Sequence, residues 1–436
     1  MTDRDLDRFR VPLSFPWLIG VYLGVNAIRD AYALVDGPDC TLYKAHYIHG
    51  RHDLNSTLLD VGGRHRIAFT NVCAQGVVRE HDAIVARGLR ALDALPEAGL
   101  LLATALPMCS ITGTDYGRII RNVRARLHKT AIDVSPGSLL GDWLDGYESV
   151  LLALARGLDL PRGRRRPGTA AVVGYLMDRN EGDHLANLAE LRRLLAAAGL
   201  ELVSVWLDGG PAAGLRRAAE AEFVVSLPYG RRAARAVARR TGARLLEAEL
   251  PFGLPATRAF VRRVAEATGR TREAEAFLDA ELRRVVPRLQ WVLPHLFLHR
   301  RVAFLGDPYL LAGFCDLADD CGMTLTGAVV TARAGHGGGR PGLAVVHEPP
   351  AEAAAMLRIL EPADLIVGSR VWGSMLAVAG PHPLYPALVE FGFPSYEHHA
   401  LLDRPFLGAD GVLALVERMA DCLYRRQPAR WDLSNE

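Results

Sequence analysis

Short apolar segments alternate with amphipathic helical segments along most of this 436-residue chain, and this alternation restricts the fold more than any other feature. The clearest example begins at residues 170–176 (AAVVGYL), continues through 185–198, where leucines repeat at helical spacing, and reaches a second apolar run at 202–207 (LVSVWL). Gly199 is typical of the residue that follows the end of such a helix. Because short, continuously apolar strands alternating with helices are characteristic of parallel sheets covered on both faces, we predict an α/β fold.

The same alternation continues toward both ends of the chain. Further strands are expected at residues 100–104, 223–227, 244–248, 301–307, 343–346 and 364–368, and helices at 25–34, 230–241 and 310–321. Two breaks divide the pattern: a basic stretch rich in breakers at 162–168 (RGRRRPG), and a helical connection at 287–299. At about 150 residues per domain, the length also suggests three domains. We therefore predict three Rossmann-like parallel-sheet domains with helices on both faces, at 1–165, 166–290 and 291–436.

Composition excludes several classes of function. A net charge of +2 and an aromatic content of 7% argue against binding to nucleic acid, and the basic stretch at 162–168 fits a solvated linker better than a nucleic-acid patch. The charged first ten residues lack the apolar core of a signal peptide, and no apolar stretch approaches the ~20 residues that span a bilayer. Six cysteines are too few for a secreted disulfide scaffold of this length. We expect a cytoplasmic protein without a membrane or nucleic-acid partner.

Three cysteines stand in turn-like or strand-end positions in the first quarter of the chain. Cys40 follows a Gly-Pro turn, Cys73 lies just past a short apolar segment, and Cys109 follows a predicted strand and a proline. Ligands of open α/β sheets gather at the carboxyl ends of strands, where Cys109 is expected. No C-x-x-C pair is present, which excludes zinc-ribbon and ferredoxin patterns, and spacing alone favours buried free thiols. The same interpretation applies to the three cysteines in helical patterns, Cys315, Cys321 and Cys422.

Histidines and glycines supply weaker candidates. His46, His49 and His52 are spaced for one helical face, but their basic and glycine neighbours favour a solvated or substrate-facing segment over a metal site. The glycine-rich run at 335–342 lacks the Gly-Lys-Ser/Thr ending of a phosphate-binding loop, which predicts a flexible surface loop. His398 stands in a loop where a doubly wound domain presents pocket residues, although a surface histidine is the commoner explanation.

Several segments, taken in order along nearly the whole chain, resemble the nitrogenase component 1 superfamily. That superfamily holds the molybdenum–iron protein subunits, their cofactor-assembly scaffold homologues, and the catalytic subunits of dark-operative protochlorophyllide and chlorophyllide reductases. The segments that carry the resemblance are 20–40, 101–115, 187–195, 250–257, 306–308, 362–368, 392–394 and 404–411. The match is partial, since Asp36 stands where the family usually has histidine and Asp39 where it has glycine.

The resemblance implies that Cys40 and Cys109 are ligands of an iron–sulfur cluster. The family's earliest ligand cysteine falls near residues 15–17, where this chain has none, and Cys73 is a candidate replacement from a different place. A simple [4Fe–4S] cluster is therefore expected. His398 falls near a cofactor-binding histidine of the nitrogenase catalytic subunit, but the companion cysteine, expected at 226–230, is absent. We expect a substrate pocket near His398 and no molybdenum–iron cofactor.

The function implied is that of a nitrogenase-like reductase subunit, an iron–sulfur-dependent oxidoreductase. Electrons would come from a separate ATP-dependent iron protein and pass through the cluster to an unidentified small-molecule substrate. A homologous component 1 subunit, or a second copy of this chain, is the expected oligomeric partner. Two alternatives stay open: a cofactor-assembly scaffold of the same fold without turnover, and a metal-free α/β transferase with paired Rossmann-like domains.

Overall fold

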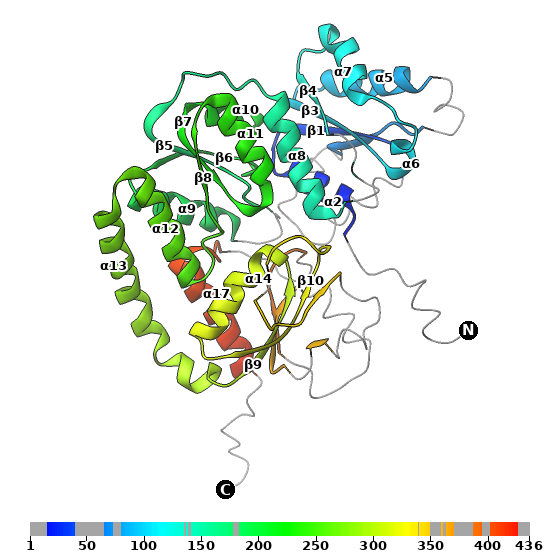
Figure 1. Cartoon of the computed structure of the whole chain (residues 1–436). Coiled ribbons are helices and arrows are strands. Elements are labelled where there is room, and N and C mark those ends of the chain that lie inside the picture. Colours follow the sequence, from blue (N-terminus) through cyan, green and yellow to red (C-terminus); the bar gives the residue numbers. More distant parts are fainter. Residues whose placement is uncertain are drawn as a thin grey trace, which may run out of the picture.

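The computed structural model describes residues 15–39, 65–72, 80–134, 137, 141–177, 183–338, 340–348, 359–360, 363–369, 387–394 and 402–425. Over these residues the chain forms three sheets with helices packed against them (Figure 1). Every strand pair within the sheets is parallel. Each sheet comes from one stretch of chain, and we call these stretches the first, second and third units. The predicted α/β fold is confirmed.

The first unit is a four-stranded sheet in the order β2-β1-β3-β4. Its strands are β1 (Ala31–Asp36), β2 (Ile67–Phe69), β3 (Leu100–Ala105) and β4 (Thr130–Asp133). Both central strands are buried along their whole length, as expected of continuously apolar strands covered on both faces. Its helical segments are α2 (Trp17–Asn26), α5 (His81–Asp93), α6 (Pro107–Ser110), α7 (Tyr116–Val123), η1 (Arg124–Arg126) and α8 (Trp143–Gly157).

The helix predicted at residues 25–34 is wrong. Helix α2 ends at Asn26, a turn follows, and Ala31–Asp36 is β1, a central strand of the sheet. Residues 31–35 (AYALV) have no polar position from which a period can be read, so helix and buried strand look alike in this part of the sequence. Pairing of β1 with both β2 and β3 decides in favour of the strand.

The second unit has the strand order β6-β5-β7-β8. Its strands are β5 (Arg166–Val173), β6 (Glu201–Val205), β7 (Ala221–Ser226) and β8 (Arg244–Glu247). The strand–helix–strand pattern predicted around residues 170–207 is confirmed, with α9 between β5 and β6. The helical segments are α9 (His184–Ala197), α10 (Ala212–Leu215), η2 (Arg216–Glu220), η3 (Pro228–Gly230), α11 (Arg231–Thr241), α12 (Leu254–Thr268) and α13 (Thr271–Leu289).

The third unit is a five-stranded sheet in the order β11-β10-β9-β12-β13. Its strands are β9 (Arg301–Gly306), β10 (Thr324–Val330), β11 (Val345–His347), β12 (Leu365–Gly368) and β13 (Ala387–Glu390). A π-helical turn, η4 (Leu293–Phe297), leads into β9, and the helices are α14 (Pro308–Asp320) and α17 (Gly408–Tyr424). Helix α17 turns back to pack on α9, α12 and α13, so this helix returns from the third unit to the second (Figure 1).

Helices α2 and α8 touch through their backbones. A Cβ atom placed on Gly20 would lie 1.7 Å from the carbonyl oxygen of Trp143, and one placed on Gly146 would lie 1.9 Å from that of Trp17. Only glycine permits so close an approach at either position. This contact fixes the amino end of α8 against α2, from which the chain turns into β1.

Buried polar contacts join the second and third units. The Asn187 side chain, fully buried in α9, accepts hydrogen bonds from the backbone N–H groups of Phe406 and Leu407 at 2.9 and 3.1 Å. Nearby, an ion-pair network links α9, α13 and α17 through Glu190, Arg193, Glu281, Arg284 and Asp410. These contacts secure the segment that returns from the third unit.

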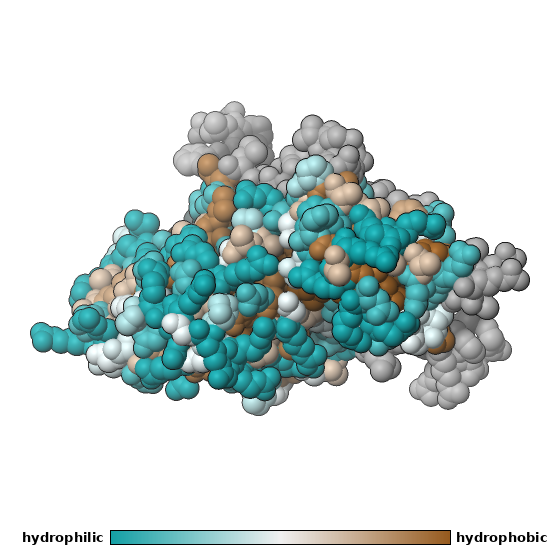
Figure 2. All heavy atoms as spheres, turned by 90° about the horizontal axis from the view of Figure 1, so that it is seen from above, coloured by the Kyte–Doolittle hydropathy of each residue, from teal (hydrophilic) through white to brown (hydrophobic). Residues whose placement is uncertain are grey.

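The face of the molecule seen from above is largely hydrophilic (Figure 2). Figure 2 shows a face dominated by hydrophilic residues, with hydrophobic ones visible in smaller patches between them. None of the described helices combines the length and the apolar composition needed to cross a bilayer.

Candidate functional site

A buried polar cluster lies at the carboxyl ends of β1, β2 and β3. Asp36 ends β1, and its carboxylate accepts hydrogen bonds from the Thr70 hydroxyl at 2.7 Å and the Tyr116 hydroxyl at 2.6 Å. The imidazole Nε2 of His81, at the start of α5, lies 2.5 Å from the same carboxylate, and its Nδ1 lies 2.9 Å from the Thr114 hydroxyl. Three segments that follow β1 at different points in the sequence therefore hold one carboxylate at the sheet edge where α/β proteins bind ligands.

Cys109 lies in this cluster, in α6 immediately after β3. Its position at the carboxyl end of a strand confirms the expectation from the sequence. The side chain is fully buried, and burial raises the pKa of the thiol to about 12, with a further contribution from the Asp36 carboxylate. The thiol is therefore protonated at neutral pH and is a weak nucleophile unless a metal displaces the proton.

Cys40 and Cys73 lie outside the described residues, one position beyond Asp39 and Val72. The segments that lead to them are tied together at the same sheet edge: Asn71 N donates to Gly37 O at 3.0 Å, and Gly37 N donates to Thr70 Oγ1 at 3.0 Å. The segment leading to Cys109 joins them through the backbone bond from Leu106 N to Asp36 O at 2.9 Å. The described segments that lead to the three cysteines thus converge on one edge.

His398 also lies outside the described residues. The loop that leads to it is fixed by a hydrogen bond from the Ser369 hydroxyl to the Pro394 carbonyl, and Phe393 packs against Phe15 and Trp143 of the first unit. A small cavity lies between the second and third units beside this loop, with a volume of about 20 Å³. It has room for about one water molecule. Its walls include Tyr175, His184, Tyr229, Asp307, Phe393 and Phe406.

Asp307 is the more deeply buried of the two carboxyl groups that line this cavity, the other being Asp183. Asp307 follows β9 and is 2% exposed; its Oδ1 accepts from Tyr309 N at 2.8 Å and its Oδ2 from the Tyr229 hydroxyl at 2.7 Å. Burial raises the pKa of Asp307 to about 6, although the bond from Tyr229 opposes the shift. Asp307 can therefore gain or lose a proton near neutral pH, as a proton donor to bound substrate must.

Replacing Asp307 by asparagine should increase the free energy of unfolding at pH 7.5, and the gain should shrink in acid. The folded pKa of about 6 lies above the ordinary value of 3.8, so the stability contributed by this group is full below pH 3.8 and is lost as pH rises through 6. The resulting penalty above pH 6 is at most about 3 kcal/mol. Urea unfolding at pH 7.5 and 5.5 measures the effect, with Asp159→Asn, an exposed aspartate, as control. If the free energies of unfolding of Asp307→Asn and wild type differ by the same amount at both pH values, the prediction is wrong.

The sequence did not reveal most of these residues. In the sequence, Asp36 stands out only as a departure from a family motif, Thr114 lies in a segment that carries the resemblance, and His81 and Tyr116 carry no signal. The one available indication was an aspartate directly before the Gly-Pro turn at the end of an apolar run, a common position for a ligand-binding side chain in an α/β protein.

These features define an α/β protein of three parallel sheets with a buried thiol and a polar cluster at the carboxyl edge of the first sheet. The family model described as nitrogenase component 1 type oxidoreductase matches residues 17–424. The chain belongs to this family. No curated relative matches the sequence.

Two solved structures show the same fold. A structure titled "Nitrogenase Cp1 at pH 6.5" is 16% identical with a TM-score of 0.80, and the match covers 97% of this chain and 95% of that chain. A second, "Nitrogenase Cp1 at pH 5", is 11% identical with a TM-score of 0.71, covering 97% and 91%. At this identity the likeness establishes the arrangement of all three units and leaves the site to be argued from this chain's own residues.

Proposed function

We propose that this protein is a nitrogenase-like reductase subunit whose cysteines Cys40, Cys73 and Cys109 hold an iron–sulfur cluster of the [4Fe–4S] type. The observation that carries the proposal is the burial of Cys109 at the carboxyl edge of the first sheet, where the segments leading to the other two cysteines are hydrogen-bonded together. Membership of a family that binds metal–sulfur clusters supports the assignment.

The residues present fit such a group. A cluster is held by thiolates, and the described segments that lead to the three cysteines meet at one edge. When bound, the cluster supplies one-electron transfer. The chain's own part is to exclude water from Cys109, to give up the thiol proton on binding, and to keep the Asp36 carboxylate fixed beside that thiol through Thr70 and Tyr116. A fixed negative charge close to a cluster favours its oxidised form and so lowers its reduction potential.

Electrons would come from an ATP-dependent iron protein, and a homologous component 1 subunit or a second copy of this chain would complete the assembly. Homologues of the family form oligomers and work with an iron protein, which supports both partners. The small-molecule substrate would bind near His398, beside the cavity of the second and third units. Asp307 and Tyr229 are placed there to supply a proton, because Tyr229 donates to a carboxylate that titrates near neutral pH.

The test is the iron and sulfide content after anaerobic purification. Wild-type protein should contain iron and acid-labile sulfide in equal amounts, and Cys40→Ser and Cys109→Ser should each lose most of both. Cys315→Ser is the matched control, since Cys315 is also a buried free thiol but lies in the third unit on α14. A colourless, iron-free wild-type protein would sink the proposal, as would full iron in Cys109→Ser. Circular dichroism shows whether each variant is folded.

The same preparation also distinguishes between two functions, a reductase and an assembly scaffold. ATP-dependent reduction of the cluster by an iron protein, followed by formation of a reduced product, supports the reductase. A cluster that is bound and transferred onward without product would show that the chain is a scaffold instead.

A further inference from the structure

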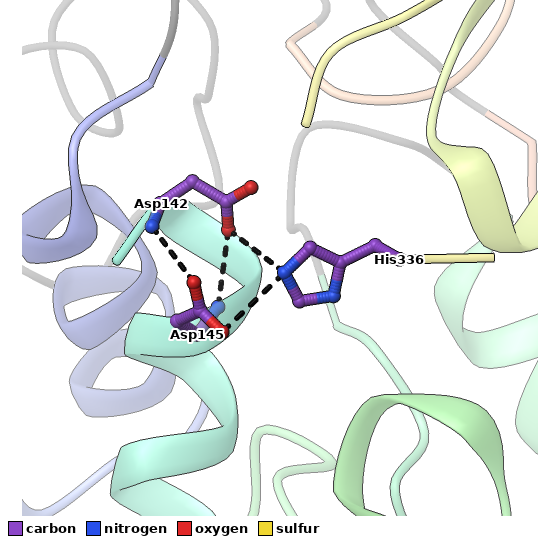
Figure 3. A group of neighbouring side chains, drawn as sticks. All are labelled: Asp142, Asp145 and His336. Carbon is purple, nitrogen blue, oxygen red and sulfur yellow. Dashed lines mark hydrogen bonds and ion pairs between the residues drawn. The ribbon is translucent and has the colours of Figure 1, made fainter. Parts of the chain in front are cut away.

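A second group of metal-ligating side chains lies far from the cysteines along the chain, where the first unit meets the third. Asp142 precedes α8 and caps it, and Asp145 lies in the first turn of the same helix. His336 comes from the glycine-rich loop that follows β10 of the third unit. Figure 3 shows the His336 ring pointing between the two carboxylates.

The distances in this group are those of ligands around one ion. His336 Nε2 lies 3.4 Å from Asp142 Oδ1 and 3.4 Å from Asp145 Oδ1, and the three atoms all lie within 4.8 Å of one another. Charge-assisted N–H···O bonds are shorter, at about 2.7–2.9 Å. In a tetrahedral site with bonds of about 2.0–2.1 Å, ligand atoms lie about 3.3–3.4 Å apart. Both separations from His336 Nε2 are therefore longer than a charge-assisted hydrogen bond and match those between ligands of a shared metal.

Each ligand is also held by its other polar atom. His336 Nδ1 lies 3.2 Å from the Tyr309 hydroxyl, which orients the ring and leaves Nε2 directed at the carboxylates. Asp142 Oδ2 accepts from Arg333 N at 2.7 Å, and Asp145 Oδ2 accepts from Asp142 N at 3.0 Å. Outer contacts of this kind fix the direction of metal ligands in proteins.

The backbone around the group is rigid. A Cβ on Gly337, which has a φ of +67°, would lie 2.4 Å from the Pro308 carbonyl oxygen, so only glycine lets the loop sit this close to α14. On the other side, Trp143 Nε1 donates to Thr331 O at 2.9 Å and joins α8 to the start of the loop. His336 is thus carried by a segment held on one side at Thr331 and on the other at Gly337.

Charge also favours a cation here. The capping bonds from Leu144 N and Asp145 N to Asp142 Oδ1 satisfy the amino end of α8, whose positive dipole would repel a bare ion. The two carboxylates more than offset that field. The positive charge of the nearby Arg333 guanidinium is paired with Glu348, 3.6 Å away. Asp145 is 42% exposed, so an ion and a water molecule can reach the group from solvent.

We propose that Asp142 Oδ1, Asp145 Oδ1 and His336 Nε2 bind a four-coordinate divalent transition metal ion such as Zn²⁺, with water as the fourth ligand. Three protein ligands with an open position are usual for such ions. The ion joins the amino end of α8 to the loop after β10, and so ties the first unit to the third. The site contains no cysteine and is independent of the proposed iron–sulfur cluster.

The test is a titration of the full-length protein with Zn²⁺ in competition with a chromogenic chelator. Wild type should bind one equivalent tightly. Loss of an outer contact already weakens metal sites by about 10–100-fold, so His336→Gln and Asp145→Asn should each weaken this site by at least about 100-fold. The Asp145→Asn substitution keeps an oxygen that can accept from Asp142 N. This variant therefore tests the site even if His336→Gln folds poorly. His128→Gln is the matched control, because His128 Nδ1 faces a single carboxylate, Asp93, at 3.0 Å.

Cobalt K-edge X-ray absorption of Co²⁺-loaded protein provides a second readout that cluster iron does not mask. Four-coordinate cobalt with nitrogen and oxygen ligands only is expected. Sulfur ligands would place the metal at the cysteines and overturn the proposal, as would unchanged Zn²⁺ affinity in both variants or no Zn²⁺ binding by wild type. Because His336→Gln and Asp145→Asn leave the three cysteines in place and neither readout requires activity, failure here is distinct from failure of the proposed reductase function.

Discussion

Replacing Gly20 by alanine should destabilise the protein by about 3 kcal/mol or more, the upper end of what overpacking usually costs. The new methyl group would lie 1.7 Å from the carbonyl oxygen of Trp143 and 2.6 Å from the backbone nitrogen of Tyr147. Neither atom can rotate away, so α2 and α8 must separate. Urea unfolding followed by circular dichroism measures the loss, and a fall in soluble yield is the expected extreme.

Two other glycines provide controls. A Cβ on Gly24, in the same helix, would meet only side-chain atoms of Val150 at 2.9 Å, which can shift, so Gly24→Ala should cost less. A Cβ on Gly214 in α10 meets nothing within 4 Å, and Gly214→Ala should be neutral or stabilising by up to about 1 kcal/mol, since alanine favours the helix. Equal stability of Gly20→Ala and Gly214→Ala would show that α2 and α8 do not touch as described.

Replacing Arg66 by methionine should cost about 3–5 kcal/mol. Arg66 is 3% exposed, and Nη1 donates to the carbonyl oxygens of Ile28 and Ala31 at 2.9 and 2.6 Å. It also donates to Val25 O at 3.1 Å, so one guanidinium satisfies the end of α2 and the turn into β1. Hydrogen bonds to charged groups contribute about 1.5–3 kcal/mol each, and the carbonyls left behind stay buried.

The guanidinium keeps its charge under ordinary conditions. Burial lowers the pKa of Arg66 to about 10, which still leaves it protonated at pH 7. Arg66→Lys, with a single nitrogen, should restore only part of the loss. Arg216→Met is the control, because Arg216 makes one exposed contact, to the Thr130 hydroxyl at 3.3 Å. Thermal unfolding of the three variants at pH 7 decides; a stable Arg66→Met protein would mean that water replaces the guanidinium at these carbonyls.

The sequence predicted well wherever the signal is local. The pattern from β5 through α9 to β6 follows from leucine spacing and a terminal glycine, both set by neighbours a few residues away. The strand Ala31–Asp36 was mistaken for a helix because an unbroken apolar run has no readable period. Three sheets could be inferred because each repeats the same local pattern.

The sites depend on contacts between distant segments, which spacing does not encode. Tyr116 reaches Asp36 across 80 positions, and His336 reaches Asp142 from another unit. The glycines around His336 indicate flexibility in isolation, yet Gly337 serves as a point of close packing. The assigned roles of Cys40, Cys73, Cys109 and His398 stay predictions, and of these residues only Cys109 lies in the described part of the chain.

Helix α8 limits where two chains of this family can be joined to form a functional hybrid. It packs against α2 of the first unit, its Tyr147 hydroxyl donates to Tyr175 O of the second at 2.9 Å, and Trp143 donates to the third. The breaker-rich stretch at 162–168, after α8, is an obvious place to join two parent chains by recombination. A chimera joined there would pack α8 of one parent against the second and third units of the other. The three units are therefore expected to be inherited together, and functional hybrids to require α8 and its contact surfaces from a single parent.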